Sequence, residues 1–360
     1  MTTDDLGVYV HIPFCASRCD YCAFATWTDR GALVDDYLDA LVVELARARE
    51  DGMLSGDVEV TSVFFGGGTP SLVPADGLVR VLDAIPMARD AEVTVECNPD
   101  TVTPQLLDTY RAGGVNRLSL GVQSMVPHVL AGLGRTHDVD GVAEAVRAAR
   151  HAGFDNVNLD LIYGGAGETL AEWRTTLDRA VALGPEHVSA YALTVEAGTP
   201  LAGDPRRHPD DDDQADKYEL ASAHLAAAGY DWYEISNWAV PGRTCRHNEL
   251  YWRQGDYLGV GCAAHSHRAG RRWWNVRTPE RYLDRVRRGR SAEADGETLS
   301  ADTQRIERLQ LELRTVRGVP ADALPTTAPD LEPLVEVQDG RARLTVAGRL
   351  LANEVSVRLR

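Results

Sequence analysis

The chain has 360 residues, a formal net charge of −17 at pH 7 and a sequence pI of about 5.0. This acidic balance would repel a phosphate backbone or an anionic bilayer, so nucleic acid and membrane surfaces are not expected partners. The length allows two domains of ordinary size, the larger with an ample core.

Cysteine usage and the N-terminal residues bear on the compartment. Three of the six cysteines fall within the first 22 residues, and the others are dispersed, which favours metal or cluster ligation over a disulfide framework. Met1 precedes polar and acidic residues, and no apolar run approaches membrane-spanning length. We therefore expect a soluble, cytoplasmic protein without a transmembrane segment.

As far as residue 235, short β-rich runs alternate with amphipathic stretches. The expected strands are residues 7–12, 58–65, 91–97, 117–122, 156–163, 187–193 and 231–235. The expected helices are residues 34–49, 71–85, 104–112, 139–152, 170–183 and 214–228. Strict alternation predicts parallel βα units, and near-continuous apolar strands suit a sheet buried on both faces. The predicted fold class is α/β, a full or partial (β/α) barrel over residues 1–236.

The pattern changes beyond residue 236. An irregular, aromatic stretch over 237–275 and a charged segment at 285–290 are interpreted as a bridge, residues 237–295. A helix at 302–316, a proline-rich connection at 320–333, a strand pair about Gly340 and a helix at 347–359 follow. They predict a small winged-helix-like α+β domain over residues 296–360. Because this acidic chain lacks a basic recognition face, packing or a lid role is favoured over DNA binding.

Cys15, Cys19 and Cys22 follow the first expected strand with C-x3-C-x2-C spacing. Three thiolates so spaced can bind three irons of a [4Fe-4S] cluster and leave the fourth iron without a protein ligand. The main alternative is a Cys3His zinc site with His11, although structural zinc sites usually join paired knuckles from separate segments. Purely structural cysteines are less expected, because thiols crowded after a strand are poorly placed for separate burial.

Further polar groups fall at or near strand ends, which meet at one mouth of a parallel barrel. They are the turn at residues 66–70, Glu96, Asn98, Gln123 and Asp160. Glycines allow backbone to approach a ligand closely, whereas Glu96, Gln123 and Asp160 offer acceptors for an ammonium group and ribose hydroxyls. Arg135 could pair with a carboxylate. Taken singly, each side chain has a plain structural explanation, such as a helix cap or a surface charge.

Several runs together resemble the coproporphyrinogen-dehydrogenase-like radical SAM proteins, over essentially the whole chain. They are residues 9–15 (YVHIPFC), 65–71 (FGGGTPS), 96–99 (ECNP), 117–124 (RLSLGVQS), 134–137 (GRTH), 158–164 (NLDLIYG) and 233–237 (YEISN). Residues 313–319 and 344–345 are similar to the family's C-terminal domain.

The resemblance implies an S-adenosylmethionine (SAM) site next to the cluster and, if SAM is cleaved reductively, an external electron donor. The implied SAM contacts are Tyr9, Tyr21, Gly67, Gly68, Thr69, Glu96, Gln123, Arg135, Asp160 and Ala192.

Two branches of the family compete: an oxygen-independent coproporphyrinogen III dehydrogenase, and a heme chaperone that binds heme and passes it to acceptor hemoproteins. The dehydrogenase pattern has a further cysteine two residues after the third cluster cysteine, where this chain has Phe24. Only 14 residues precede Cys15, whereas the dehydrogenase has a substantial segment there. Both features favour the chaperone, and we therefore expect no coproporphyrinogen dehydrogenase activity.

Residues 245–252 (CRHNELYW) are similar to the His-Asn-x-x-Tyr-Trp motif of the chaperone branch, which implies that His247 binds heme iron. Without the motif, a hydrogen-bonded loop histidine would be the simpler interpretation. Four aromatic residues could cover a macrocycle or belong to the core: Tyr251, Trp252, Trp273 and Trp274. No C-x-x-C-H run indicates covalent heme attachment. A second metal site at Cys245, Cys262, His265 and His267 is an alternative that no closed ligand spacing requires.

Three places depart from the family pattern or have no assigned role. Residues 163–169 read YGGAGET where YGLPGQT is usual, and Cys262-Ala263 replaces Pro-Gly. We expect a looser loop there. The acidic run 210–213 is expected to be a solvated loop before a helix.

Overall fold

The computed structural model describes residues 5–54, 58–325 and 328–360. Outside this range lie residues 1–4, on which part of the expectation about the N-terminus rests. Residues 326–327 of the expected proline-rich connection lie outside it too. Within it, a 12-stranded sheet has the order β12-β11-β10-β9-β1-β2-β3-β4-β5-β6-β8-β7 and does not close on itself. The fold is therefore an α/β partial barrel, as predicted.

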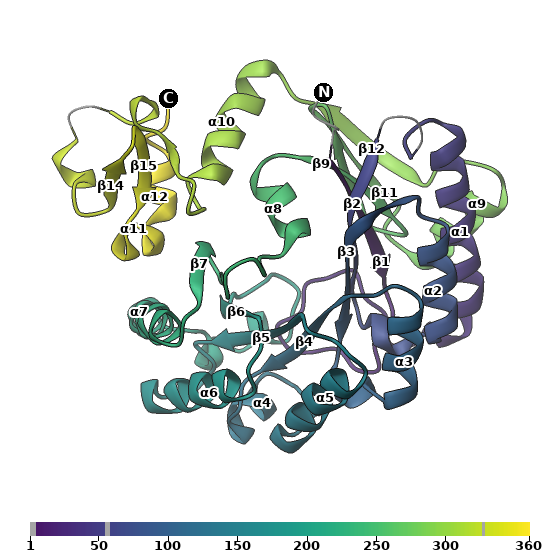
Figure 1. Ribbon diagram of the computed structural model, residues 1–360, viewed down its shortest axis with the longest axis horizontal. Helices are drawn as coiled ribbons and strands as arrows, with labels where there is room; N and C mark the ends of the chain where they lie inside the picture. The colour runs from purple at the N-terminus through teal and green to yellow at the C-terminus, as the bar shows by residue number, and fades with distance from the viewer. Residues whose placement is uncertain (1–4, 55–57, 326–327) are drawn as a thin grey trace.

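Seven neighbouring strands, from β9 through β1 to β6, run parallel. The first six in the chain are β1 (Asp5–Ile12), β2 (Glu59–Gly67), β3 (Met87–Cys97), β4 (Arg117–Gln123), β5 (Val157–Tyr163) and β6 (His187–Ala192). The connecting helices are α1 (Val34–Glu50), α2 (Ala75–Asp83), α3 (Pro104–Ala112), α4 (Pro127–Gly132), α5 (Val139–His151), α6 (Leu170–Ala182) and α7 (Asp211–Ala227). They follow the outer side of the curved sheet (Figure 1).

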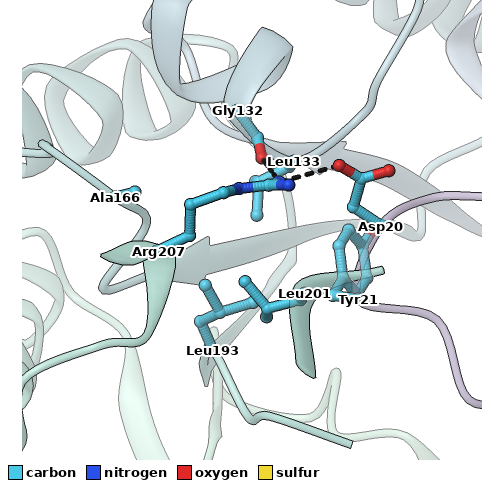
Figure 2. Close-up of a pocket in the computed structure, with 8 residues that line it drawn as sticks. All are labelled: Asp20, Tyr21, Gly132, Leu133, Ala166, Leu193, Leu201 and Arg207. Carbon is cyan, nitrogen blue, oxygen red and sulfur yellow. Dashed lines mark hydrogen bonds and ion pairs between the residues drawn. The ribbon is translucent and has the colours of Figure 1, made fainter. Parts of the chain in front are cut away.

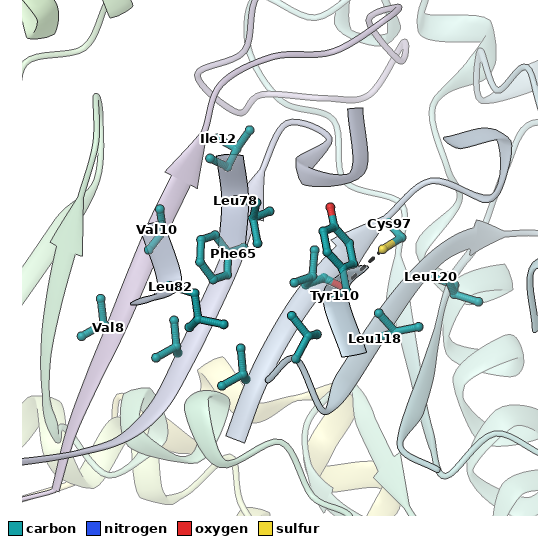
Figure 3. Packing of buried hydrophobic residues seen from close by; sticks show 14 of the residues in the cluster. Val8, Val10, Ile12, Phe65, Leu78, Leu82, Cys97, Tyr110, Leu118 and Leu120 are labelled. Carbon is teal, nitrogen blue, oxygen red and sulfur yellow. Dashed lines mark hydrogen bonds between the residues drawn. The ribbon is translucent and has the colours of Figure 1, made fainter. Parts of the chain in front are cut away.

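Side-chain alternation along the strands divides the sheet into an apolar outer face and a polar inner face. Val8, Val10 and Ile12 of β1 are buried toward the helices, where Leu78 and Leu82 of α2 meet them (Figure 3). The intervening residues therefore point to the inner side. The same alternation on β2 to β6 places a set of polar side chains there: Ser62, Glu92, Glu96, Arg117, Ser119, Asn158, Asp160, His187 and Ser189. Polar and charged side chains therefore cover the inner face from β2 to β6.

Residues 231–275 are more regular than predicted. β7 (Asp231–Glu234) pairs antiparallel with β8 (Asn237–Ala239), which pairs antiparallel with β6, so the expected seventh strand does not continue the parallel repeat. The stretch expected to be irregular contains α8 (Arg246–Trp252), β9 (Asp256–Val260), β10 (His265–Arg268) and β11 (Arg271–Asn275). β9 runs parallel to β1, so this segment extends the barrel sheet. Short runs rich in His, Arg and Trp do not show the apolar alternation that marked the earlier strands.

The acidic run belongs to a helix, not to a loop. The Asp210 side chain accepts a hydrogen bond from the Asp213 amide as the N-cap, and residues 211–213 form the first turn of α7. Carboxylates are favourable at a helix N-terminus because the helix dipole is positive there. The earlier expectation, that the helix began at Gln214, was therefore wrong by one turn.

After α9 (Pro279–Arg287) and β12 (Glu293–Thr298), a small unit follows α10 (Ala301–Glu312). Its sheet has the order β13-β15-β14, with β13 (Val319–Pro320), β14 (Val335–Gln338) and β15 (Arg341–Leu344). The expected last helix is two short ones, α11 (Val346–Leu350) and α12 (Ala352–Ser356), broken at Leu351. This unit has a core of its own, in agreement with a small winged-helix-like α+β domain. The domain limits at residues 236 and 295 stay predictions.

Candidate cluster and cofactor site

The three clustered cysteines lie on the loop that follows β1. The loop is closed on itself by hydrogen bonds from the Cys15 amide to the Trp27 carbonyl (3.1 Å) and from the Trp27 amide to the Pro13 carbonyl (2.8 Å). All three thiols are free and partly exposed. Burial raises the pKa of the Cys15 thiol, and the nearby Cys22 and Cys19 thiols raise it further. The three thiols thus share one loop at the end of β1.

His11 is not available as a fourth ligand for zinc. Its Nε2 bonds the Ala25 carbonyl at 2.9 Å and its Nδ1 bonds the Tyr9 hydroxyl at 3.0 Å. Burial lowers the pKa of His11 to about 4, so the ring is neutral at pH 7. In the part of the chain that the structure describes, no three His, Cys, Asp or Glu side chains converge as ligands of one metal ion. A cubane instead requires each thiolate to reach a different iron.

The glycine-rich turn after β2 lies directly against the cysteine loop. The amides of Gly68 and Thr69 donate to the carbonyls of Ile12 and Phe14, each at 2.8 Å. A Cβ at Gly68 would lie 2.6 Å from the Phe14 oxygen and 2.8 Å from that of Ile12, so only glycine permits this approach. Thr69 Oγ1 donates to Cys15 Sγ at 3.7 Å.

Two carboxylates lie on the inner face of the sheet, Glu96 on β3 and Asp160 on β5. Glu96 Oε2 accepts the Gly67 amide at 3.1 Å. Asp160 accepts from Ser119 Oγ at 2.7 Å and from Asn158 Nδ2 at 2.9 Å. Burial and the Asp160 charge raise the pKa of Glu96 to about 8. A cation bound between them would relieve this repulsion, because it favours the ionised form.

Arg135 reaches the cysteine loop from the segment after α4. Its guanidinium donates to Cys19 Sγ at 3.3 Å, to the Gly121 carbonyl at 2.8 Å and to the Asn98 side chain. Its Nε is buried and has no hydrogen-bond partner among the described residues. An unsatisfied buried donor is costly, and a ligand carboxylate would satisfy it.

The remaining predicted SAM contacts surround these groups. Gln123 ends β4 in the left-handed region (φ 65°) at an irregularity in the pairing with β5, a conformation often held at functional sites. Tyr21 packs against the small cluster of Leu133, Leu193 and their neighbours. Ala192 is exposed at the end of β6, and Tyr9 faces inward from β1. Gln123 and Ala192 thus lie at the ends of β4 and β6, Tyr21 in the cysteine loop and Tyr9 within β1, and their contacts with SAM stay predictions.

His247 lies deeper, on α8, which occupies the inner side of the sheet (Figure 1). The residue is 1% exposed, and its ring stacks on Phe64 with centroids 5.4 Å apart. Nδ1 bonds Ser62 Oγ and Nε2 bonds the Tyr251 hydroxyl, each at 2.9 Å. Burial lowers its pKa to about 3, so the imidazole is neutral. Neither Ser62 nor the Tyr251 contact was predicted; the period-2 inner face of β2 is the signal that points to Ser62.

The alternative second metal site does not assemble. Cys245 caps α8 beside Glu92, while Cys262 accepts from the Tyr37 hydroxyl at 3.5 Å. His267 Nδ1 bonds the Gly255 carbonyl at 3.0 Å. The aromatic residues suggested as a cover for the heme macrocycle do not form one group. Trp273 and Trp274 belong to β11, where Trp273 contacts Arg271 and Trp274 contacts His265. Of that group, Tyr251 touches His247.

A parallel partial barrel with three thiols after its first strand and a ligand cradle at its mouth defines a radical SAM protein. Residues 9–180 match the model of the radical SAM superfamily. The chain is 42% identical to heme chaperone HemW of Mycobacterium tuberculosis over 99% of this chain and 95% of that protein. It is 34% identical to heme chaperone HemW of Bacillus subtilis over 97% of both. The chain belongs to the HemW family.

The solved structures include a close match in fold. Coproporphyrinogen III oxidase (HemN) from Escherichia coli, a radical SAM enzyme, superposes with a TM-score of 0.83 at 26% identity. The match covers 98% of this chain and 89% of that one. Separately, none of the helices within residues 5–54, 58–325 and 328–360 is both long and apolar enough to cross a bilayer.

Proposed function

We propose that this chain is a heme chaperone that binds a [4Fe-4S] cluster, SAM and heme, and transfers heme to acceptor hemoproteins. The observation that carries the proposal is that two candidate sites lie on the same inner side of the sheet. The mouth has the thiols of Cys15, Cys19 and Cys22 beside Arg135, and deeper lies His247 with a neutral ring. The names of the relatives support the same function.

The donor set at the mouth fits the two cofactors. Cys15, Cys19 and Cys22 would hold the cluster, and iron would displace the thiol protons, as metal ligation requires. A cluster bound there would supply an electron to the sulfonium of SAM. The SAM amino group would be held by Glu96, and its carboxylate by Arg135, whose Nε lacks a partner in the described chain. Asp160 offers acceptor atoms to ribose hydroxyls.

The heme-binding part of the proposal depends on the His247 imidazole. A neutral ring has a free lone pair for iron only at a nitrogen that no donor occupies. Ser62 holds Nδ1 from β2, which leaves Nε2 as the nitrogen that would reach iron once Tyr251 releases it. The ring is then both neutral and oriented.

The competing function is that of the HemN-type dehydrogenase, whose fold this chain shares. Phe24 occupies the position of the additional dehydrogenase cysteine, and its side chain is 67% exposed. A phenyl ring has no thiol to offer at that position, so the local chemistry favours the chaperone.

Two assays on the anaerobically reconstituted protein separate the functions. Heme-loaded protein is mixed with an apo-hemoprotein, and the transfer rate is measured against acceptor concentration. We expect the rate to rise with the acceptor, and we expect no decarboxylation of coproporphyrinogen III with SAM and reductant. Acceptor-independent release, or robust decarboxylation without heme binding, would overturn the proposal. A Cys19→Ser variant should lose iron, sulfide and the visible cluster absorption.

A further inference from the structure

A small cavity lies beside the cysteine loop, with Asp20 and Tyr21 of that loop in its lining. Three segments supply most of its lining, the cysteine loop, the end of α4 and the segment after β6, and Ala166 comes from the loop after β5 (Figure 2). Its lining is Asp20, Tyr21, Gly132, Leu133, Ala166, Leu193, Leu201 and Arg207. The first of these segments carries the cluster cysteines, the second leads into Arg135, and the third starts directly after Ala192.

Asp20 is the residue through which the three segments are joined. It stands between Cys19 and Cys22 in the chain. Its amide donates to the Leu133 carbonyl at 3.3 Å, and its carbonyl accepts the Leu201 amide at 3.0 Å. Gly134, in the left-handed region at φ 72°, lies so close that a Cβ there would be 3.0 Å from Asp20 Oδ1. The backbone of Asp20 is thus held from both sides.

Arg207 completes this arrangement with the only charge pair that reaches Asp20 in the described chain. Its guanidinium donates to Asp20 Oδ2 at 2.7 Å and to the Gly132 carbonyl at 2.5 Å (Figure 2). The side chains of Arg207 and Asp20 are 26% and 32% exposed, so solvent screens the pair only in part. A charge-assisted bond at a partly dry position is stronger than an exposed ion pair.

We propose that Arg207 is a positioning residue for the cluster: it latches the cysteine loop to the end of α4 and to the segment after β6. Arg207 touches none of the three cysteines, so it acts through Asp20. This latch keeps the distance between Cys19 and Cys22 constant. It also fixes the end of α4, and so the position from which Arg135 donates to Cys19 Sγ. The inference rests on the proposed cluster site and adds a residue that the radical SAM motif does not contain.

The test compares Arg207→Gln with Arg206→Gln. Arg206 is the matched control, because it is the adjacent arginine, its side chain is 88% exposed, and its ion pair is with Asp204. Each reconstituted protein is exposed to a chelator, and the decay of cluster absorption is followed. Arg207→Gln should release the cluster faster by on the order of tenfold, the effect of losing one charge-assisted hydrogen bond. Arg206→Gln should match the wild type.

Further variants separate positioning from general destabilisation. Asp20→Asn should show the same faster release, and the double variant should add little, because both changes remove one interaction. Arg207→Lys should release the cluster more slowly than Arg207→Gln, since lysine keeps the positive charge but lacks the forked guanidinium. Thermal unfolding of the apo-proteins is measured in parallel. Equal release rates for Arg207→Gln and wild type, or a strictly additive double variant, would overturn the inference.

Hydrogen exchange of the apo-protein distinguishes this failure from failure of the proposed function. Amides of residues 15–22 should exchange faster in Arg207→Gln than in Arg206→Gln, whether or not a cluster is present. If wild type assembles no cluster, the proposed function fails while the exchange data still decide the latch. Unchanged exchange in this loop would contradict the latch alone.

Discussion

Ionisation of the Glu96 carboxyl group should control SAM binding at the mouth of the barrel. Its raised pKa, about 8, arises from burial and from Asp160, and it leaves the group largely protonated at pH 7. A bound ammonium favours the ionised carboxylate. SAM affinity should therefore rise by on the order of 15-fold from pH 6.5 to pH 8, the range in which the ionised fraction of the free group grows from roughly 3% to about half. Equilibrium binding of SAM to the reconstituted protein measures this.

Glu96→Gln is the matched variant, because it keeps the shape and removes the titration. It should bind SAM more weakly and with little change over the same pH range. A pH dependence in the variant equal to that of wild type would assign the titration to another group.

At the residue scale, positions after strands predicted that the C-x3-C-x2-C run and Glu96 lie at one mouth, and the structure places them at the ends of β1 and β3. Arg135, predicted as a partner for a carboxylate, donates to Cys19 Sγ. The roles of these residues in cofactor binding stay predictions. The partners of His247 were not predictable in the same way. Ser62 precedes it by 185 residues, and Tyr251 could equally have faced solvent or core. Contacts of this kind depend on how α8 enters the sheet.

At the element scale, a second residue of α8 blocks the ring nitrogen of His247 that we propose binds heme iron. Tyr251 stands one turn after His247, and its hydroxyl occupies Nε2 while its ring meets the imidazole edge-on at 5.0 Å. Tyr251→Phe removes the hydroxyl and keeps the ring. Heme should then bind more tightly, by roughly 2- to 10-fold, because about 0.5–1.5 kcal/mol no longer has to be lost before ligation. Anaerobic heme titration followed by Soret absorbance gives the affinity.

Ser62→Ala supplies the opposite control for the same titration. It removes the partner of Nδ1 and should leave the ring less well oriented, so heme affinity should fall or stay constant. Weaker binding in Tyr251→Phe would show that the hydroxyl assists heme binding and would contradict this account of α8.

The loop after β5 shows how far a departure from the family pattern can mislead. Residues 163–169 were expected to be looser, yet Glu168 accepts the Gly164 amide at 2.8 Å. Lys217, fully buried on α7, donates to the Glu168 carbonyl at 2.7 Å and also pairs with Asp213. The contacts of Lys217 with Glu168, which include an ion pair at 3.5 Å, link the loop to a helix residue 49 positions later in the chain. Because a buried lysine is rarely visible in a sequence pattern, this restraint could not be predicted locally.

At the scale of the whole molecule, βα periodicity was enough to predict the parallel barrel, and the change of pattern from residue 301 onward predicted a small α+β unit. It was not enough to predict how the sheet is completed. β9 joins β1 from 250 residues later in the chain, and its pairing partner is decided by tertiary packing rather than by local pattern. The C-terminal unit is attached by the Val316 amide, which donates to the Tyr233 carbonyl at 2.9 Å, and by Arg349, 3.5 Å over the Trp232 ring.

This completion matters for function because it surrounds α8. The helix packs against β2 and β9 of the sheet and against α10 of the C-terminal unit. His247 is 1% exposed, between α8 and the inner face of the sheet. Heme ligation by this residue would therefore require α8 or its surroundings to move.

The most direct test of the account is a heme titration of anaerobically reconstituted wild type and His247→Gln. Glutamine keeps a polar side chain of similar reach and removes the imidazole ligand. The account predicts saturable binding in wild type, with the spectrum of a histidine-ligated heme, and both a weaker affinity and a changed spectrum in the variant. Identical affinities and spectra for the two proteins would contradict it.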